Sequence, residues 1–182
     1  MADVNQLITD FYRVATTREF ARDYNFRVLS ISTGGASDVT FDNDDLVYIK
    51  TASLPERSIS NVTVPYMGLN FNIPGNATYP GSDAYSLTFY ADSQSKIRQK
   101  FEQWSQDIFN DATSTGNYFA PKQTAIIDLV QLDNQMNKVG QYQLVGVSVR
   151  SVGPLNYNIS DGNGSTIEFV ATISFHYWRK LS

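Results

Sequence analysis

The chain has 182 residues, enough to bury one hydrophobic core and too few for two comfortable domains. Charged residues make up only 18% and the net charge is −4, so much of the surface must be uncharged or covered by partners. The sequence has no Lys or Arg run of the kind that binds nucleic acid tightly, and it has no cysteine for disulfides or Cys-ligated metals. It also has no window of 18 apolar residues, so we expect no stable membrane insertion.

The N-terminal segment, residues 1–25, is expected to form a helix or arm. Between residues 3 and 16, apolar side chains recur at spacings of three and four, which indicates one apolar stripe on an amphipathic helix. The stripe consists of Val4, Leu7, Ile8, Phe11, Tyr12 and Ala15. We expect this short helix to lie in a groove.

Alternation of apolar and polar residues predicts that most of the remaining chain is β-structure. Gly34–Gly35 indicates a turn, and the acidic stretch 38–45 predicts an exposed loop. Strands are expected at residues 26–31, 46–50, 85–92, 124–132 and 141–150.

The pattern of residues 54–74 predicts an extended hairpin. Val62, Val64 and Tyr66 alternate with polar residues up to a turn at Met67–Gly68, after which the alternation resumes. The apolar residues of the returning strand are Leu69, Phe71 and Ile73. One face of this hairpin is therefore apolar, and the other carries amide and hydroxyl groups.

Residues 92–111 contain the strongest helix signal. Asp92, Ser93 or Ser95 is available to cap its N-terminus. Apolar residues follow at i, i+4, i+7 and i+11, namely Ile97, Phe101, Trp104 and Ile108. We expect these four side chains to belong to the core and to pack the helix against a sheet.

The C-terminal segment, residues 161–182, holds the longest alternation in the chain. A tight-turn signal at 161–164 precedes it. A single strand over 166–178 would span roughly 40 Å at about 3.3 Å per residue. Such a strand would leave a long edge, and natural proteins blunt, cover or pair long edges.

These elements predict one α+β domain over residues 1–182. It is expected to be mainly antiparallel, a sandwich or partial barrel, with one packed helix and an N-terminal helix or arm. Its faces of Ser, Thr, Asn and Gln suit either a solvated sheet or a channel wall, and the sequence leaves both open. Pairing with identical copies in a closed ring would remove the strand edges, so the first expected partner is the chain itself.

Residues able to carry out chemistry are sparse. His176 is the only histidine, and no nucleophile motif accompanies Ser174 or Asp128, the partners that a catalytic triad would need. The acidic cluster at 42–45 lacks the glycine and the closing Glu of a calcium loop. We therefore expect no enzymatic activity, no cofactor and no metal.

Four segments occur in the order found in one known family. Residues 20–28 have the pattern F-A-R-x-x-x-F-x-V, and residues 98–104 have R-Q-K-F-x-x-W. Residues 51–68 match a long hairpin, and residues 168–178 match a last strand that ends in an aromatic pair. Together they resemble the tail tube protein family of contractile-tailed bacteriophages. The chain departs from that pattern past Trp178 and at the acidic stretch.

This resemblance implies hexameric rings whose subunits share a β-barrel around a lumen. The rings stack into a tube inside a contractile sheath, and DNA passes through the tube into the host. The implied partners are the tail sheath protein, a baseplate tube-initiator, a tail terminator and, transiently in the lumen, a tape measure protein and DNA. We expect the protein in the phage tail of the virion, assembled in the host cytoplasm.

The polar face of the hairpin supplies the expected wall residues, which are Ser60, Asn70 and Asn72. The residues expected to contact the adjacent ring are Leu54, Pro55, Tyr66 and Met67. Together with hairpin residues 58–73, strands near 123–132 and 141–149 are expected to close the barrel with neighbouring subunits.

Two alternatives remain from the sequence. The same fold could serve as a baseplate tube-initiator, or as the inner tube of a phage-derived injection or type VI secretion machine. A protein of another class, a β-rich carbohydrate-binding module, is favoured by the 11 tyrosines and the Asn-rich loops.

Overall fold

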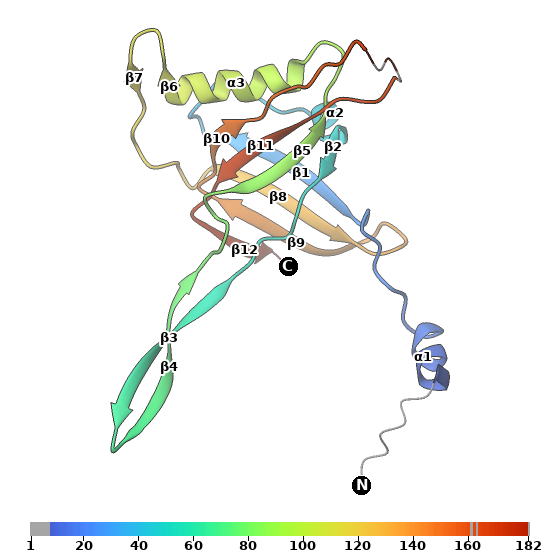
Figure 1. Ribbon diagram of the computed structural model, residues 1–182, viewed down its shortest axis with the longest axis vertical. Coiled ribbons are helices and arrows are strands. Elements are labelled where there is room, and N and C mark those ends of the chain that lie inside the picture. The colour runs from blue at the N-terminus through green and yellow to red at the C-terminus, as the bar shows by residue number, and fades with distance from the viewer. Residues whose placement is uncertain (1–7, 161, 163, 182) are drawn as a thin grey trace.

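Two antiparallel four-stranded sheets form the body of the protein (Figure 1). The computed structural model describes residues 8–160, 162 and 164–181. Sheet A has the order β1 (Phe26–Thr33), β8 (Ala125–Leu132), β9 (Lys138–Val145) and β12 (Tyr177–Leu181). Sheet B has the order β10 (Ser148–Val152), β11 (Glu168–Ser174), β5 (Tyr85–Tyr90) and β2 (Ile49–Thr51). The predicted fold class is confirmed, and the sheets do not close into a barrel within one chain.

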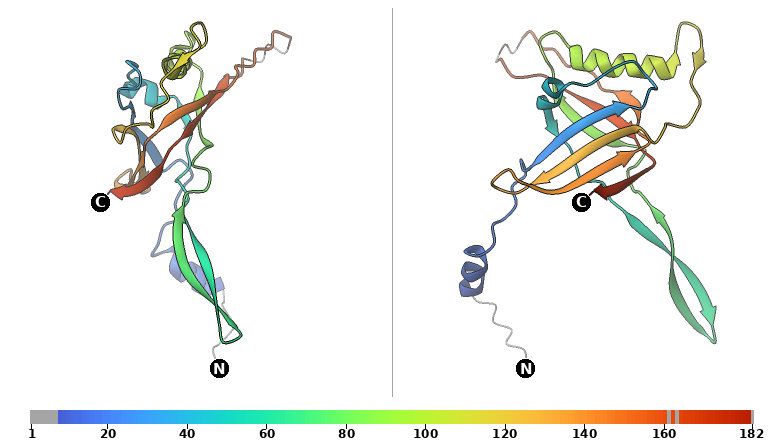
Figure 2. Two further views of the ribbon diagram at one scale, coloured as in Figure 1. Left: turned by 90° about the vertical axis from the view of Figure 1, so that its left-hand side faces the viewer. Right: turned by 180° about the vertical axis from the view of Figure 1, so that it is seen from behind.

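The remaining elements extend from this body. A hairpin of β3 (Ser58–Tyr66) and β4 (Leu69–Thr78) leaves it between β2 and β5 and points away from it (Figures 1 and 2). A second, very short pair consists of β6 (Phe109–Asn110) and β7 (Thr115–Gly116). The helices are α1 (Ile8–Ala15), α2 (Asn43–Val47) and α3 (Lys96–Ile108). None of the helices in the described ranges is long and apolar enough to cross a bilayer.

Alternation along the strands places the core between the sheets. In sheet B, Leu87, Phe89 and Phe169 point inward and are fully or almost fully buried. Ile127 and Leu144 of sheet A meet them in the same hydrophobic cluster. The intervening residues face outward, which is the period of two expected for strands with one buried face.

The two sheets are joined at a corner that the sequence analysis missed. The predicted single strand 166–178 is wrong, because β11 ends at Ser174 in sheet B and the chain restarts as β12 in sheet A. The predicted strand 141–150 divides in the same way at Gly146, between β9 and β10. Gly146 has φ +71°, and a Cβ there would lie 2.4 Å from Nδ1 of His176. Only glycine fits at this crossing.

Helix α3 lies across one end of the sandwich (Figure 1). It is shorter than the predicted range 92–111, because residues from Phe109 onward pair with β7 instead. Ile97, Phe101 and Trp104 are buried, and Ile108 packs on the edge of the core. The Phe101 ring lies 5.2 Å from Phe89 between centroids, which fixes the helix on sheet B.

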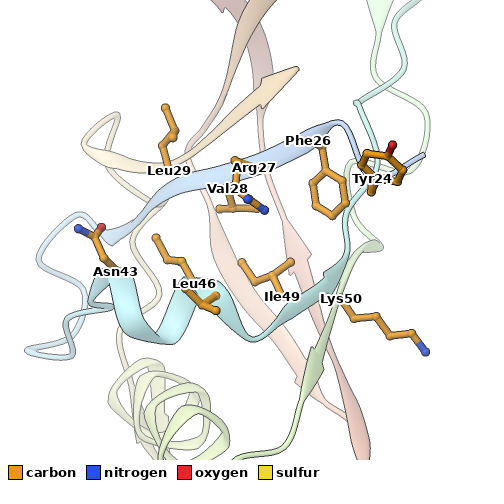
Figure 3. Close-up of a pocket in the computed structure, with 10 residues that line it drawn as sticks. Tyr24, Phe26, Arg27, Val28, Leu29, Asn43, Leu46, Ile49 and Lys50 are labelled. Atoms are coloured by element: carbon orange, nitrogen blue, oxygen red, sulfur yellow. The ribbon is translucent and has the colours of Figure 1, made fainter. Parts of the chain in front are cut away.

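The acidic segment is partly helical, where the sequence predicted a loop followed by a strand at 46–50. Asp42 and Asp45 form a capping box around the start of α2, and β2 begins only at Ile49. Between α2 and β1 a groove of about 410 Å³ is open at the surface, with Leu46 and Ile49 facing Phe26 and Val28 (Figure 3). The described residues contain no cluster of side chains suited to hold a metal ion.

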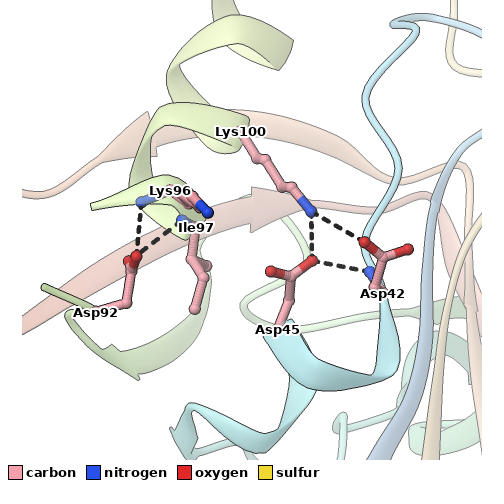
Figure 4. A network of polar contacts seen from close by, with 6 residues as sticks. All are labelled: Asp42, Asp45, Asp92, Lys96, Ile97 and Lys100. Carbon is pink, nitrogen blue, oxygen red and sulfur yellow. Dashed lines mark hydrogen bonds and ion pairs between the residues drawn. The ribbon is translucent and has the colours of Figure 1, made fainter. Parts of the chain in front are cut away.

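Lys100 ties α2 to α3 (Figure 4). Its Nζ lies 2.6 Å from Asp45 and 3.5 Å from Asp42. Partial burial lowers the pKa of Lys100, but the hydrogen bond and charge of Asp45 outweigh this effect, so the pKa lies above its usual value. Asp42 and Asp45 therefore form ion pairs with Lys100 that hold the two helices together.

Two predicted segments are only partly described. Val4 and Leu7 of the expected N-terminal stripe lie outside the described residues, and the described part of that segment is helical over α1. The expected turn at 161–164 also lies partly outside them.

Replacing Trp104 with alanine is expected to lower the free energy of unfolding by about 3 to 5 kcal/mol, because a fully buried Trp leaves a cavity. Trp104→Phe is the matched control. The indole N–H has no hydrogen-bond partner among the described residues, so this change removes volume without breaking a bond and costs less. Urea denaturation of the monomer measures the unfolding free energy of both variants. A loss below about 1 kcal/mol for Trp104→Ala would contradict the packing of α3 in the core.

Asp92→Ala is expected to destabilise the protein by about 1 kcal/mol, because Asp92 caps α3. Its carboxylate accepts hydrogen bonds from the backbone N–H groups of Lys96 at 3.0 Å and Ile97 at 3.4 Å. Ser95 occupies the N-cap position but makes no capping bond with its side chain. Ser93→Ala serves as the control in thermal unfolding, and equal losses in the two variants would contradict the assignment of the cap to Asp92.

Candidate assembly surface

The β3–β4 hairpin carries an apolar row that no other described part of the chain covers. Cross-strand register pairs Val62 with Ile73, Val64 with Phe71 and Tyr66 with Leu69. These six side chains, the apolar row, are between 40% and 65% exposed. An isolated two-stranded ribbon is marginally stable in water, and an exposed apolar patch commonly marks an interaction surface. We therefore expect another surface to pack on this row.

The opposite face of the hairpin is uncharged and polar, and the three expected wall residues do not share it. Asn70 and Asn72 lie on this polar face with Thr63, whose hydroxyl donates to Asn72 Oδ1 at 3.0 Å. Ser60 alternates with Val62 and therefore lies on the apolar side, where its hydroxyl donates to the carbonyl of Asn76 at 3.2 Å. Alternation along β3 decides this separation, because successive side chains of a strand point to opposite faces.

The four residues expected to contact the next ring lie at two ends of the hairpin. Tyr66 and Met67 form its tip, and Met67 is 85% exposed. Leu54 and Pro55 lie at its base, more than a full strand length from the tip. The structure therefore separates them into two surfaces.

Two aromatic side chains, one from each sheet, fix the base of the hairpin. The Tyr85 hydroxyl of β5 donates to the Ser53 carbonyl at 2.6 Å, and burial raises the pKa of Tyr85. The Trp178 indole N–H of β12 donates to the Glu56 carbonyl at 2.9 Å. Sequence reasoning missed both roles, although each residue is an aromatic with a polar tip near a strand end.

Hydrogen-bond pairing shows which strand edges another copy could use. The segment 123–132 expected to close a barrel contains β8, and the segment 141–149 contains most of β9 and the start of β10. Strands β8 and β9 lie inside sheet A with neighbours on both sides, whereas β10 is an outer strand of sheet B. An interior strand has no unpaired edge to offer. The outermost strands are β1 and β12 in sheet A, and β10 and β2 in sheet B.

The outward face of sheet B carries mainly the hydroxyl side chains of Ser and Thr. Three cross-strand pairs on this face are Thr172 with Ser86, Ser148 with Ser174 and Val170 with Thr88, and all of these residues except Val170 carry a hydroxyl group. Two ion pairs lie at the ends of this hydroxyl face. Lys50 lies 2.5 Å from Glu168, and Arg150 lies 2.9 Å from Asp83. The centre of this face therefore presents no charge.

The outward face of sheet A is organised differently. One hydrogen-bonded chain crosses all four strands: Ser30 donates to Asp128 at 2.8 Å, and Gln143 donates to the same carboxylate at 2.8 Å. Arg179 then donates to Gln143 Oε1 at 2.5 and 2.9 Å. These bonds occupy both oxygens of Asp128, and this face carries charge at its centre.

The residues considered for catalysis are engaged elsewhere. Ser174 donates to the backbone carbonyl of Ser148 at 3.3 Å, and Asp128 belongs to the chain across sheet A. His176 is exposed and lies against Gly146 at the corner. Within the described ranges, none of the hydrogen bonds links these three side chains, so they do not form a triad.

Comparisons with known proteins agree with this architecture. The family model described as phage tail tube protein matches residues 12–179. Among solved structures, the chain is similar to one in the baseplate of the anti-feeding prophage, with 13% identity, TM-score 0.60 and coverage of 91% of this chain and 97% of that one. No curated protein matches the sequence significantly.

Two further similar structures come from an extracellular contractile injection system called PVC. A chain of its sheath/tube terminator has 10% identity and TM-score 0.60, with coverage of 91% of this chain and 99% of that one. A chain of its sheath–tube complex has 11% identity and TM-score 0.56, with coverage of 94% and 97%. At such identities the likeness concerns the fold, whereas the family model matches nearly the whole sequence. The chain belongs to the phage tail tube protein family.

Proposed function

We propose that this chain is the repeating subunit of a phage tail tube, in which hexameric rings stack around a central channel. The observation that carries the proposal is the uncovered hairpin, whose apolar row extends from a body that is otherwise well packed. Rings would close by pairing the outer strands of neighbouring copies, and the hairpins would join the assembly by burying their apolar rows. The role is structural rather than catalytic.

The channel wall in this proposal combines two uncharged surfaces. The hydroxyl face of sheet B is continuous along the chain with the hairpin, because β2 leads into β3 and β4 leads into β5. The polar face of the hairpin adds Asn70 and Asn72. A wall without fixed positive charge would let DNA move without retaining its phosphates. This assignment replaces the expected contribution of β8 and β9.

The family and the similar structures support a sheath and end proteins as further partners. Those structures come from a baseplate, a sheath/tube terminator and a sheath–tube complex. For this chain we propose a contractile sheath outside, a tube-initiator and a terminator at the ends, and a tape measure protein and DNA transiently inside. Such a tube would belong to the virion and assemble in the host cytoplasm.

Purified protein is expected to form rings and tubes when it is concentrated, because other copies of the chain would cover hairpin rows that the described residues leave exposed. Negative-stain electron microscopy and sedimentation velocity measure this directly. Monodisperse monomers at high concentration, with no rings or tubes, would overturn the proposal. Single rings that never elongate would instead assign the chain to the tube-initiator of a baseplate.

Val64→Lys is expected to abolish rings and tubes and to leave the unfolding free energy of the monomer within about 1 kcal/mol of the parent. Val64 lies in the apolar row, so its loss affects assembly more than folding. Asn70→Lys on the polar face is the matched control and should still assemble. Electron microscopy and urea denaturation give the two readouts, and normal tubes from Val64→Lys would contradict the role of the row.

A further inference from the structure

Helix α1 presents a second apolar surface, which the described residues leave largely exposed although the Phe20 ring stacks 5.9 Å from that of Phe11. Ile8, Phe11, Tyr12 and Ala15 are spaced i, i+3, i+4 and i+7 and form one stripe, the α1 stripe. No residue of α1 is buried, and Phe11 and Tyr12 are 59% and 64% exposed. A helix of eight residues is marginal in water, so its stability depends on packing against something else.

The segment after α1 is joined to the body by hydrogen bonds around Asn134. The Asn134 side chain donates to Glu19 at 2.7 Å and to the carbonyl of Phe20 at 3.2 Å, and it accepts from Asn25 at 2.7 Å. Backbone hydrogen bonds continue through Thr16, Thr17 and Arg18 onto the last turn of α1. The helix is therefore held away from both sheets (Figure 1).

The hairpin and α1 project beyond the same end of the body, opposite the end that carries α3, and on opposite flanks (Figures 1 and 2). In a cyclic ring every contact is heterologous, so one flank of each copy meets the other flank of its neighbour. The hairpin of one copy then lies on the side where the next copy presents α1.

We propose that the α1 stripe of one copy packs on the apolar row of the hairpin of the neighbouring copy. Each surface supplies what the other lacks, because a two-stranded ribbon gains stability from a helix on its face, and a short helix gains it from a sheet. Residues 58–78 contain no charged side chain, and Asp10 and Arg13 lie on the side of α1 away from the stripe, where they pair with each other. The contact therefore buries no charge.

The area of this contact is consistent with one part of a larger ring interface. The aromatic side chains that would meet are Phe11, Tyr12, Tyr66 and Phe71, each about half to two thirds exposed. Together they would bury on the order of 400 Å², since a fully buried aromatic side chain removes about 150 to 250 Å². A standard stable interface buries about 1,600 Å² in total. The helix and hairpin would thus add to strand pairing between neighbours.

The test uses the absence of cysteine in the chain. Ala15→Cys in the α1 stripe and Val62→Cys in the apolar row are small changes at the two proposed surfaces. Equal amounts of the two single variants are mixed, assembled and treated with a short bismaleimide. The proposal expects a cross-linked dimer that contains one chain of each variant, with a yield at least tenfold above that of Ala15→Cys with Val139→Cys, an exposed control position on β9.

Other outcomes would overturn the proposal. A cross-link between Ala15→Cys and Val47→Cys would place α1 in the groove beside α2 instead. A cross-link within single chains of the double variant Ala15→Cys/Val62→Cys would show that α1 covers its own hairpin. Phe11→Asp should abolish the intermolecular cross-link, and Arg13→Gln, on the far side of the helix, should leave it unchanged.

This inference rests on the proposed tube, and the two can fail separately. Rings and tubes without the Ala15–Val62 cross-link would refute the packing of α1 and leave the tube subunit intact. A parent protein that forms no ring at all would refute the proposed function itself.

Discussion

The two shortest connections between the sheets, β9 to β10 and β11 to β12, pass through one corner, where the backbone of Gly146 lies against the ring of His176. The N–H groups of Gly146 and Val147 donate to the carbonyl of Ala125 at 2.9 and 3.1 Å, and the N–H of His176 donates to Val145 at 2.9 Å. This corner turns β11 into β12, and so brings Trp178 to the base of the hairpin. The direction of the hairpin therefore depends on a glycine far from it in the sequence.

The body and the hairpin differ in where their apolar side chains lie. The body buries its large side chains between its own sheets and under α3, so it can fold as one copy. The hairpin keeps its apolar row at the surface, and in the proposed tube other copies would cover it. If the proposed tube forms in this way, folding and assembly use separate sets of apolar residues, and one can be altered without the other.

The sequence was informative where short-range patterns decide the structure. The turn at Met67–Gly68 and the buried face of α3 follow from local spacing. The break between β11 and β12 could not be predicted, because alternation continues through a corner and does not say to which sheet a strand belongs. Helix α2 depends on Lys100, more than fifty residues away in the sequence. Ser60 was assigned to the wall by its chemistry, although counting by two from Val62 places it on the apolar side.

Each strand of the hairpin contains one proline inside its paired region, Pro65 in β3 and Pro74 in β4. A proline is tolerated in a ladder where its nitrogen faces the open edge, so each outer edge lacks one donor. The free monomer consequently offers an interrupted template to stray strands, a common defence of exposed edges against fibrous aggregation. A subunit made in many copies can in this way stay dispersed until a ring accepts it.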